Sequence, residues 1–188
     1  MSQLSLQSLI SVSDFALPAK LCDGLVADFE IAHGQQRVGG REAQLGFEES
    51  AWTEIGLGEV ADGALKGYFL NQMSQQLDVY NEKFQFPVPI PFSGKMSELC
   101  IKRYRAGTTD RFQVHFDSIG LVANRYLVFL WYLNDVEHGG ETYFPQLDVS
   151  IAPQRGRLLI FPPYWMYQHQ GNSPKSGEKY ILSSYLTF

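Results

Sequence analysis

The sequence is poor in cysteine, in positive charge and in long apolar runs, and each shortage excludes a class of protein. Its 188 residues include 2 cysteines, too few for a disulfide framework, so we expect two unpaired thiols in a reducing, cytoplasmic environment. The 15 Lys and Arg are outnumbered by 20 Asp and Glu, which argues against a nucleic-acid partner. The longest apolar run, Leu127 to Leu133, is far shorter than the roughly 20 residues of a membrane span, so no membrane partner is expected. The first residues show no pattern of an export signal.

The overall composition is that of a folded globular protein. Hydrophobic residues make up 45% of the chain and charged residues 19%, which excludes a disordered or collagen-like polypeptide. The length is that of one ordinary hydrophobic core. We therefore expect a single domain over residues 1–188, with helical support and covering loops in 1–94 and a β-rich core in 95–188.

The N-terminal half has helical periodicity interrupted by loops. Apolar residues recur at three- and four-residue intervals from Asp14 to Ile31, which predicts a helix capped by Ser13 or Asp14, and again from Ala61 to Phe84. Residues 33–50 contain four glycines and no sustained period, which indicates a long loop or an irregular extended segment. Three prolines between Phe86 and Phe92 then predict a connector to the C-terminal half.

The C-terminal half consists of short β-branched and aromatic runs separated by turn residues. Eight strands are predicted, at Leu99–Arg105, Phe112–Asp117, Arg125–Leu133, Thr142–Phe144, Val149–Ile151, Arg157–Phe161, Trp165–His169 and Lys179–Leu186. Strands so closely spaced, without intervening helices, favour an antiparallel barrel or jelly roll. The fold class is therefore mainly β with N-terminal helices, an α+β arrangement.

Three residues of this half are candidate metal ligands. His115 and Asp117 are two apart on a predicted strand, so their side chains share one face. His169 lies near the end of a later predicted strand, which a jelly roll can bring opposite the first. Two imidazoles and one carboxylate form the ligand set that non-haem Fe(II) prefers, although an isolated His-x-Asp motif also occurs by chance.

The ordered context of these residues carries a family resemblance. After His115 and Asp117 come, in this order, a paired-glycine segment from Gly139 to Pro145, then Pro153 and Gly156, then His169, and finally Gly177 and Lys179. Over residues 97–188 this series resembles the Fe(II)/2-oxoglutarate-dependent oxygenases of the prolyl 4-hydroxylase type. The resemblance implies a double-stranded β-helix, a cupin-like jelly-roll barrel braced by helices, and makes 95–188 its catalytic core.

The resemblance also implies the cofactors and their ligands. Fe(II) is expected on His115, Asp117 and His169, which are therefore the catalytic residues, with O2 as the oxidant and ascorbate as a candidate reductant. The cosubstrate 2-oxoglutarate would place its distal carboxylate on Lys179, since a buried carboxylate needs a charge partner. Because Asp117 keeps a carboxylate where related halogenases have a small residue, hydroxylation is favoured.

Three further residues match cosubstrate-binding positions of the family. They are Tyr104, Thr142 and Tyr132. Tyr104 lies two residues further from His115 than in the common family pattern, and Phe112 stands where relatives carry a tyrosine. Core packing is the alternative explanation for these aromatic residues.

The expected substrate is a peptidyl proline, hydroxylated at an aliphatic C–H bond with release of succinate and CO2. A free amino acid or other small molecule is the alternative. Two further hypotheses are a non-catalytic metal-binding barrel and a zinc hydrolase, and neither explains Lys179.

Overall fold

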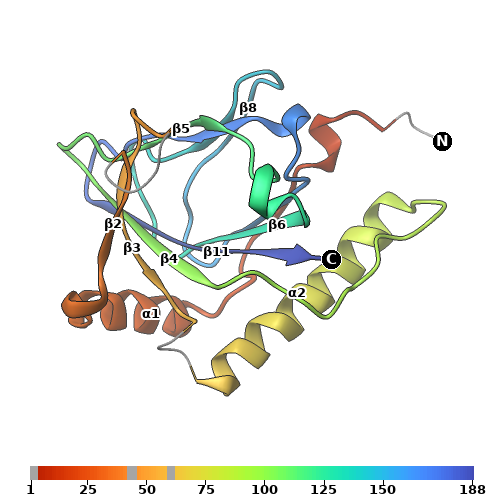
Figure 1. Ribbon diagram of the computed structural model, residues 1–188, viewed down its shortest axis with the longest axis horizontal. Helices are drawn as coiled ribbons and strands as arrows, with labels where there is room; N and C mark the ends of the chain where they lie inside the picture. Colours follow the sequence, from red (N-terminus) through yellow and green to blue (C-terminus); the bar gives the residue numbers. More distant parts are fainter. Residues whose placement is uncertain (1–3, 42–45, 59–61) are drawn as a thin grey trace.

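The computed structural model describes residues 4–41, 46–58 and 62–188, and its core is a pair of facing antiparallel sheets (Figure 1). The major sheet has the strand order β1 (Ser11–Ser13), β9 (Leu158–Phe161), β6 (Arg125–Tyr132), β11 (Glu178–Thr187), β4 (Cys100–Arg105), β3 (Ala51–Gly56) and β2 (Arg37–Gly40). The minor sheet has the order β5 (Phe112–His115), β10 (His169–Gly171), β7 (Thr142–Phe144) and β8 (Val149–Ile151). This is the jelly-roll arrangement that the strand spacing predicts.

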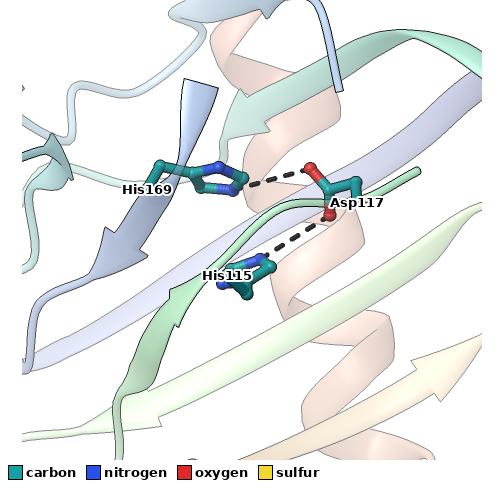
Figure 2. Close-up of side chains that lie close together, drawn as sticks. All are labelled: His115, Asp117 and His169. Atoms are coloured by element: carbon teal, nitrogen blue, oxygen red, sulfur yellow. Dashed lines mark ion pairs between the residues drawn. The ribbon is translucent and has the colours of Figure 1, made fainter. Parts of the chain in front are cut away.

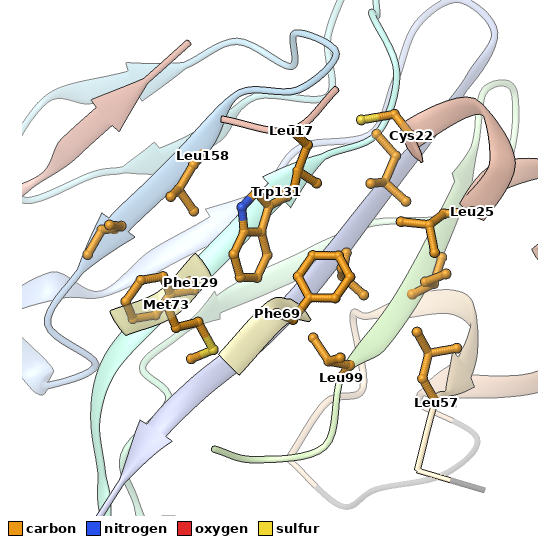
Figure 3. Close-up of a cluster of buried hydrophobic side chains, with 14 of the residues drawn as sticks. Leu17, Cys22, Leu25, Leu57, Phe69, Met73, Leu99, Phe129, Trp131 and Leu158 are labelled. Atoms are coloured by element: carbon orange, nitrogen blue, oxygen red, sulfur yellow. The ribbon is translucent and has the colours of Figure 1, made fainter. Parts of the chain in front are cut away.

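Two helices cover the outer face of the major sheet. Figure 1 shows α1 (Ala19–Ile31) and α2 (Gly63–Phe84) on the side away from the minor sheet. The N-terminus of α2 is capped by Asp62, whose side chain accepts a hydrogen bond from the Leu65 N–H at 2.8 Å. The helices and the sheet enclose a cluster of buried apolar side chains, in which Phe69 of α2 packs edge-on against Trp131 of β6 (Figure 3).

The central strands are buried on both faces, and their side chains alternate between two clusters. On β6, Phe129 and Trp131 face the helices, whereas Leu130 and Tyr132 face the space between the sheets. The same alternation operates on β11. There, Tyr180 and Leu182 pack toward the helices, and the odd-numbered residues point between the sheets.

The predicted fold class is confirmed, and β7 and β8 have the predicted bounds. The first helix, however, begins at Ala19 and not near Ser13 or Asp14, because residues 11–13 pair with β9 as an edge strand and Asp14 forms an ion pair with Arg157. The second helix begins at Gly63; Ala61, where it was predicted to begin, lies outside the described residues.

The prediction of a long loop at 33–50 was wrong in part. Residues 33–35 form a 3-10 turn and β2 pairs with β3 at the edge of the major sheet, while residues 42–45 lie outside the described ranges. The register of β2 places Gly39 against Trp52, so the glycines here serve close strand packing. The N-terminal half therefore supplies β1, β2 and β3 to the major sheet.

Around the candidate ligands, two strands begin or end at residues other than those predicted. Trp165–Tyr167 is a 3-10 turn, and β10 begins at His169, so this histidine starts a strand where it was predicted to end one. Strand β5 ends at His115, and Asp117 lies just beyond it. Cys22 and Cys100 are unpaired, as predicted. No helix within the described ranges combines the length and apolar character of a membrane span.

Candidate metal centre and adjoining pocket

The three candidate ligands converge between the sheets, as Figure 2 shows. His115 and His169 are direct partners in the register of β5 and β10, so their rings lie side by side with centroids 4.3 Å apart. The chain turns after His115, and the N–H groups of Asp117 and Ser118 both donate to the carbonyl of Pro163 at 3.0 Å. One ligand atom from each of the three residues lies within 4.8 Å of the others.

Backbone contacts orient both imidazoles toward the centre. Nδ1 of His115 lies 2.8 Å from the carbonyl oxygen of Gln113, and Nδ1 of His169 lies 3.0 Å from that of Tyr167. A carbonyl only accepts hydrogen bonds, so each Nδ1 carries a proton, and in the neutral form of the ring Nε2 keeps its lone pair for a metal ion. Nε2 of His115 lies 3.6 Å from Oδ1 of Asp117 and Nε2 of His169 lies 3.6 Å from Oδ2, so donor atoms of all three residues face one another.

The charge state of the centre suits a cation. Burial and the neighbouring His115 lower the pKa of His169 to about 4, so its imidazole is neutral at pH 7. Burial raises the pKa of Asp117, but the two imidazoles and the Tyr185 hydroxyl outweigh it and hold the pKa below its ordinary value. Within the described residues, the buried Oδ2 of Asp117 has no hydrogen-bond partner. A buried anionic oxygen without a donor is costly, so this centre fits a divalent metal ion.

A buried lysine lies in the pocket next to these ligands. The inner pocket, as we name it, is lined among others by His115, Asp117, His169, Tyr104, Thr142 and Lys179. Lys179 is 1% exposed, and its ammonium lies 4.9 Å above the Tyr104 ring. Within the described ranges no carboxylate forms an ion pair with it, and burial lowers its pKa to about 7 despite the nearby charge of Glu141. An anionic ligand in this pocket would supply the missing partner.

The other predicted cosubstrate residues occupy two layers. Tyr104 and Thr142 line the inner pocket. Tyr132 lies behind Thr142 and donates a hydrogen bond to its Oγ1 at 2.7 Å, so Tyr132 orients the threonine from outside the pocket. Phe112 stacks on the ring of His115 with centroids 3.6 Å apart, so it supports a ligand histidine.

Among the residues of the inner pocket that sequence reasoning missed, Lys102 and Tyr185 carry polar groups close to the candidate ligands. Tyr185 donates a hydrogen bond to Oδ1 of Asp117 at 2.9 Å, and the ammonium of Lys102 lies 5.2 Å from the centre of the Phe112 ring. Their signal is the two-residue period of a strand. Lys102 shares a face of β4 with Tyr104, and Tyr185 shares a face of β11 with Lys179.

A second hollow opens from the metal centre toward the surface. This outer groove, as we name it, shares six lining residues with the inner pocket, namely Lys102, Phe112, His115, Asp117, Ser183 and Tyr185. Its further lining includes aromatic and charged side chains, namely Phe47, Trp52, Glu54, Glu98, Phe116 and Arg125. The candidate ligands His115 and Asp117 therefore line both hollows.

Two histidines and one aspartate are the ligand set that non-haem Fe(II) oxygenases use, and here the three residues lie between the sheets of a jelly roll. Residues 99–187 match the model of the 2OG-Fe(II) oxygenase superfamily, so this part of the chain is similar to the members of that enzyme superfamily. Members of this superfamily use Fe(II), 2-oxoglutarate and O2, and the His/Asp/His cluster lies within the matched residues.

Individual relatives are prolyl hydroxylases. The probable prolyl 4-hydroxylase 11 of Arabidopsis thaliana is 34% identical over 95 residues, which cover 45% of this chain and 32% of the relative, so the chain spans about a third of that protein. A Pseudomonas putida prolyl-4-hydroxylase has the same fold, with a TM-score of 0.71, 20% identity and coverage of 96% of this chain and 93% of that one. A prolyl hydroxylase from Trichoplax adhaerens, in complex with a hypoxia inducible factor oxygen degradation domain peptide fragment, gives a TM-score of 0.70, 15% identity and coverage of 95% and 83%.

Proposed function

We propose that this protein is an Fe(II)- and 2-oxoglutarate-dependent dioxygenase that hydroxylates a peptidyl proline and releases succinate and CO2. The observation that carries the proposal is the inner pocket, in which a three-donor metal centre and the unpaired ammonium of Lys179 line one cavity. A zinc hydrolase or a metal-binding barrel needs the first feature but has no use for the second.

Each residue then has a role in this proposal. His115, Asp117 and His169 hold the metal, and three ligands on one face leave room for cosubstrate and oxygen. Lys179 pairs with the distal carboxylate of 2-oxoglutarate, while Thr142 and Tyr104 contact the cosubstrate and Tyr132 orients Thr142. Fe(II), when bound, supplies the activation of O2 and the oxidation of the C–H bond.

The outer groove supports a peptide over a free amino acid. It leads from the ligands to the surface, and its aromatic walls include Phe47, Trp52 and Phe116. Aromatic faces suit the apolar ring of a proline, and an open groove leaves space for the chain on either side of it. The fold of the Trichoplax adhaerens enzyme, which binds a peptide, is the same. A free amino acid is the second candidate, because Glu54 and Lys102 in the groove offer both charges that such a zwitterion requires.

The deciding experiment compares succinate formation with proline-containing peptides and with free L-proline. The Fe(II)-loaded protein is supplied with 2-oxoglutarate and O2, and hydroxylated product is identified by mass spectrometry. We expect peptides to stimulate succinate release and to gain one oxygen atom, and we expect the His115→Ala variant to do neither. Hydroxylation of free L-proline without any response to peptides would replace the peptidyl substrate by the small-molecule alternative. Substrate turnover that Zn(II) supports in the absence of O2 and 2-oxoglutarate would reject the proposal that this protein is an oxygenase.

Three remaining expectations belong to this proposal. Ascorbate acts as a reductant that restores the metal to Fe(II), so its omission should shorten the linear phase of turnover. Residues 1–188 act as one oxygenase domain, since α1, α2 and the major sheet share one apolar cluster. A cytoplasmic location is supported by the two free thiols at Cys22 and Cys100.

A further inference from the structure

The two oxygens of Asp117 have different surroundings. Oδ1 accepts a hydrogen bond from the Tyr185 hydroxyl at 2.9 Å. Oδ2 is buried and has no hydrogen-bond partner among the described residues. The carboxylate is 7% exposed, so water from the surface has little access to either oxygen. Each oxygen faces the Nε2 atom of one histidine at 3.6 Å, but only Oδ1 accepts a hydrogen bond, so Oδ2 is the oxygen left for a ligand.

The tyrosine that makes this contact is itself held in place. The guanidinium of Arg125 lies 3.8 Å from the centre of the Tyr185 ring, within the range of a cation–π contact. Nη1 of the same arginine lies 3.4 Å from the main-chain oxygen of Asp117. Arg125 thus links the tyrosine ring to the backbone of the residue that the tyrosine contacts. A ring confined in this way presents its hydroxyl to Oδ1 in one orientation.

We propose that Tyr185 is a positioning residue for the metal centre, which holds Oδ1 of Asp117 so that Oδ2 is the single carboxylate oxygen presented to the metal. Arg125 supports it by fixing the tyrosine ring. This inference rests on the proposed Fe(II) site. Groups that hydrogen-bond to metal ligands orient them, and their loss typically weakens metal binding about 10–100-fold. An unrestrained carboxylate can instead rotate or bind through both oxygens, which occupies a coordination position.

The test is Co(II) binding to the metal-free full chain, measured by equilibrium dialysis and by the visible absorption of the bound ion. Tyr185→Phe keeps the ring and removes the hydroxyl, so we expect about 10–100-fold weaker Co(II) binding and an altered spectrum. Tyr180→Phe is the matched control, because Tyr180 lies on the same strand, faces the helices and bonds to Glu30. It should bind Co(II) like the wild type.

The possible results separate the positioning role of Tyr185 from the proposed metal site itself. If a folded Tyr185→Phe protein binds Co(II) with wild-type affinity and spectrum, the positioning role is rejected while the metal site stands. If the wild type binds no Co(II), or His115→Ala binds it equally well, the proposed function itself is rejected. Should Tyr185→Phe fail to fold, Arg125→Met serves as the second variant, with several-fold weaker binding expected. Unchanged binding in a folded Arg125→Met protein would also overturn the inference.

Discussion

At the scale of single residues, the site is built from groups that are costly to bury. Lys179 is enclosed between the sheets without an ion-pair partner in the described ranges, and Asp117 keeps one oxygen without a donor. Each would be stabilised by a ligand of opposite charge. The free protein therefore carries unfavourable interactions that cosubstrate and metal would relieve, which is typical of a functional site.

The first prediction concerns the affinity for 2-oxoglutarate. Lys179→Met removes the charge and keeps much of the apolar stem, so a distal carboxylate would be buried without a partner. We expect a loss of about 2–5 kcal/mol in cosubstrate binding, with metal binding retained. The dissociation constant for 2-oxoglutarate, measured with the Mn(II)-loaded protein without O2, checks this. Lys175→Met is the control, because Lys175 is an exposed lysine nearby. If both variants bind 2-oxoglutarate with equal affinity, Lys179 does not pair with the distal carboxylate of the cosubstrate.

The second prediction uses the same variant to test stability against pH. Burial lowers the pKa of Lys179 from 10.5 to about 7, so between these values the unfolded chain binds a proton that the folded chain does not. The contribution of this lysine to the free energy of unfolding therefore rises with pH between about 7 and 10.5. Below about pH 7 the charged lysine destabilises the folded protein by the full cost of its burial. Without metal and cosubstrate, we expect Lys179→Met to be more stable than the wild type at pH 7. The difference should shrink toward pH 10 in urea unfolding experiments, and a difference independent of pH would contradict the shift.

At the scale of elements, strand pairing and tight turns bring the site together. The pairing of β5 with β10 places His115 opposite His169, and the turn before β7 packs against the segment that leads into β11. Gly139 and Gly140 in this turn have φ values of +77° and +76°, which favour glycine. A Cβ on Gly139 would lie 2.6 Å from the backbone oxygen of Ser173.

The third prediction follows from this turn. Gly139→Ala should destabilise the protein by about 1–2 kcal/mol through the left-handed conformation alone, and further through the contact with the Ser173 carbonyl. Gly24→Ala in α1 is the matched control, since nothing lies within 4 Å of its added Cβ. There the same substitution should stabilise the helix by about 0.5–1 kcal/mol. Urea unfolding measures the change in the free energy of unfolding, which should be negative for Gly139→Ala and positive for Gly24→Ala. An unchanged stability of Gly139→Ala would show that the turn can rearrange.

At the scale of the whole molecule, the helices and the barrel depend on one apolar cluster. Phe69 of α2 is fully buried against Trp131 of β6, and Arg103 of β4 forms an ion pair with Glu30 of α1. The face of the major sheet that α1 and α2 cover carries large side chains, which would be exposed to water without the helices. The N-terminal and C-terminal halves should therefore unfold together.

The fourth prediction tests this coupling. Phe69→Ala, which is remote from the metal centre, should cost about 3–5 kcal/mol because it leaves a cavity against Trp131. Far-UV circular dichroism and the absorption of bound Co(II) should then report the same lowered midpoint in urea. Val79→Ala on the same helix is the control, since Val79 is 52% exposed and should have little effect. Two separate transitions would show that the barrel folds without α2.

Local patterns in the sequence were sufficient for most strands of the C-terminal half, and they singled out His115, Asp117, His169 and Lys179, which the fold places around one pocket. The two-residue period of a strand is visible in a short stretch of chain, and the order of the motif residues can be read along the sequence. Both can therefore be recognised without knowing the fold. The edge strands β1 (SVS) and β2 (RVGG) could not be predicted in this way, because they have little apolar alternation of their own and form through pairing with β9 and β3. The hydrogen bond from Tyr185 to Asp117 joins residues 68 positions apart. Such a contact depends on how β11 faces the end of β5, and that geometry arises when the two sheets pack against each other.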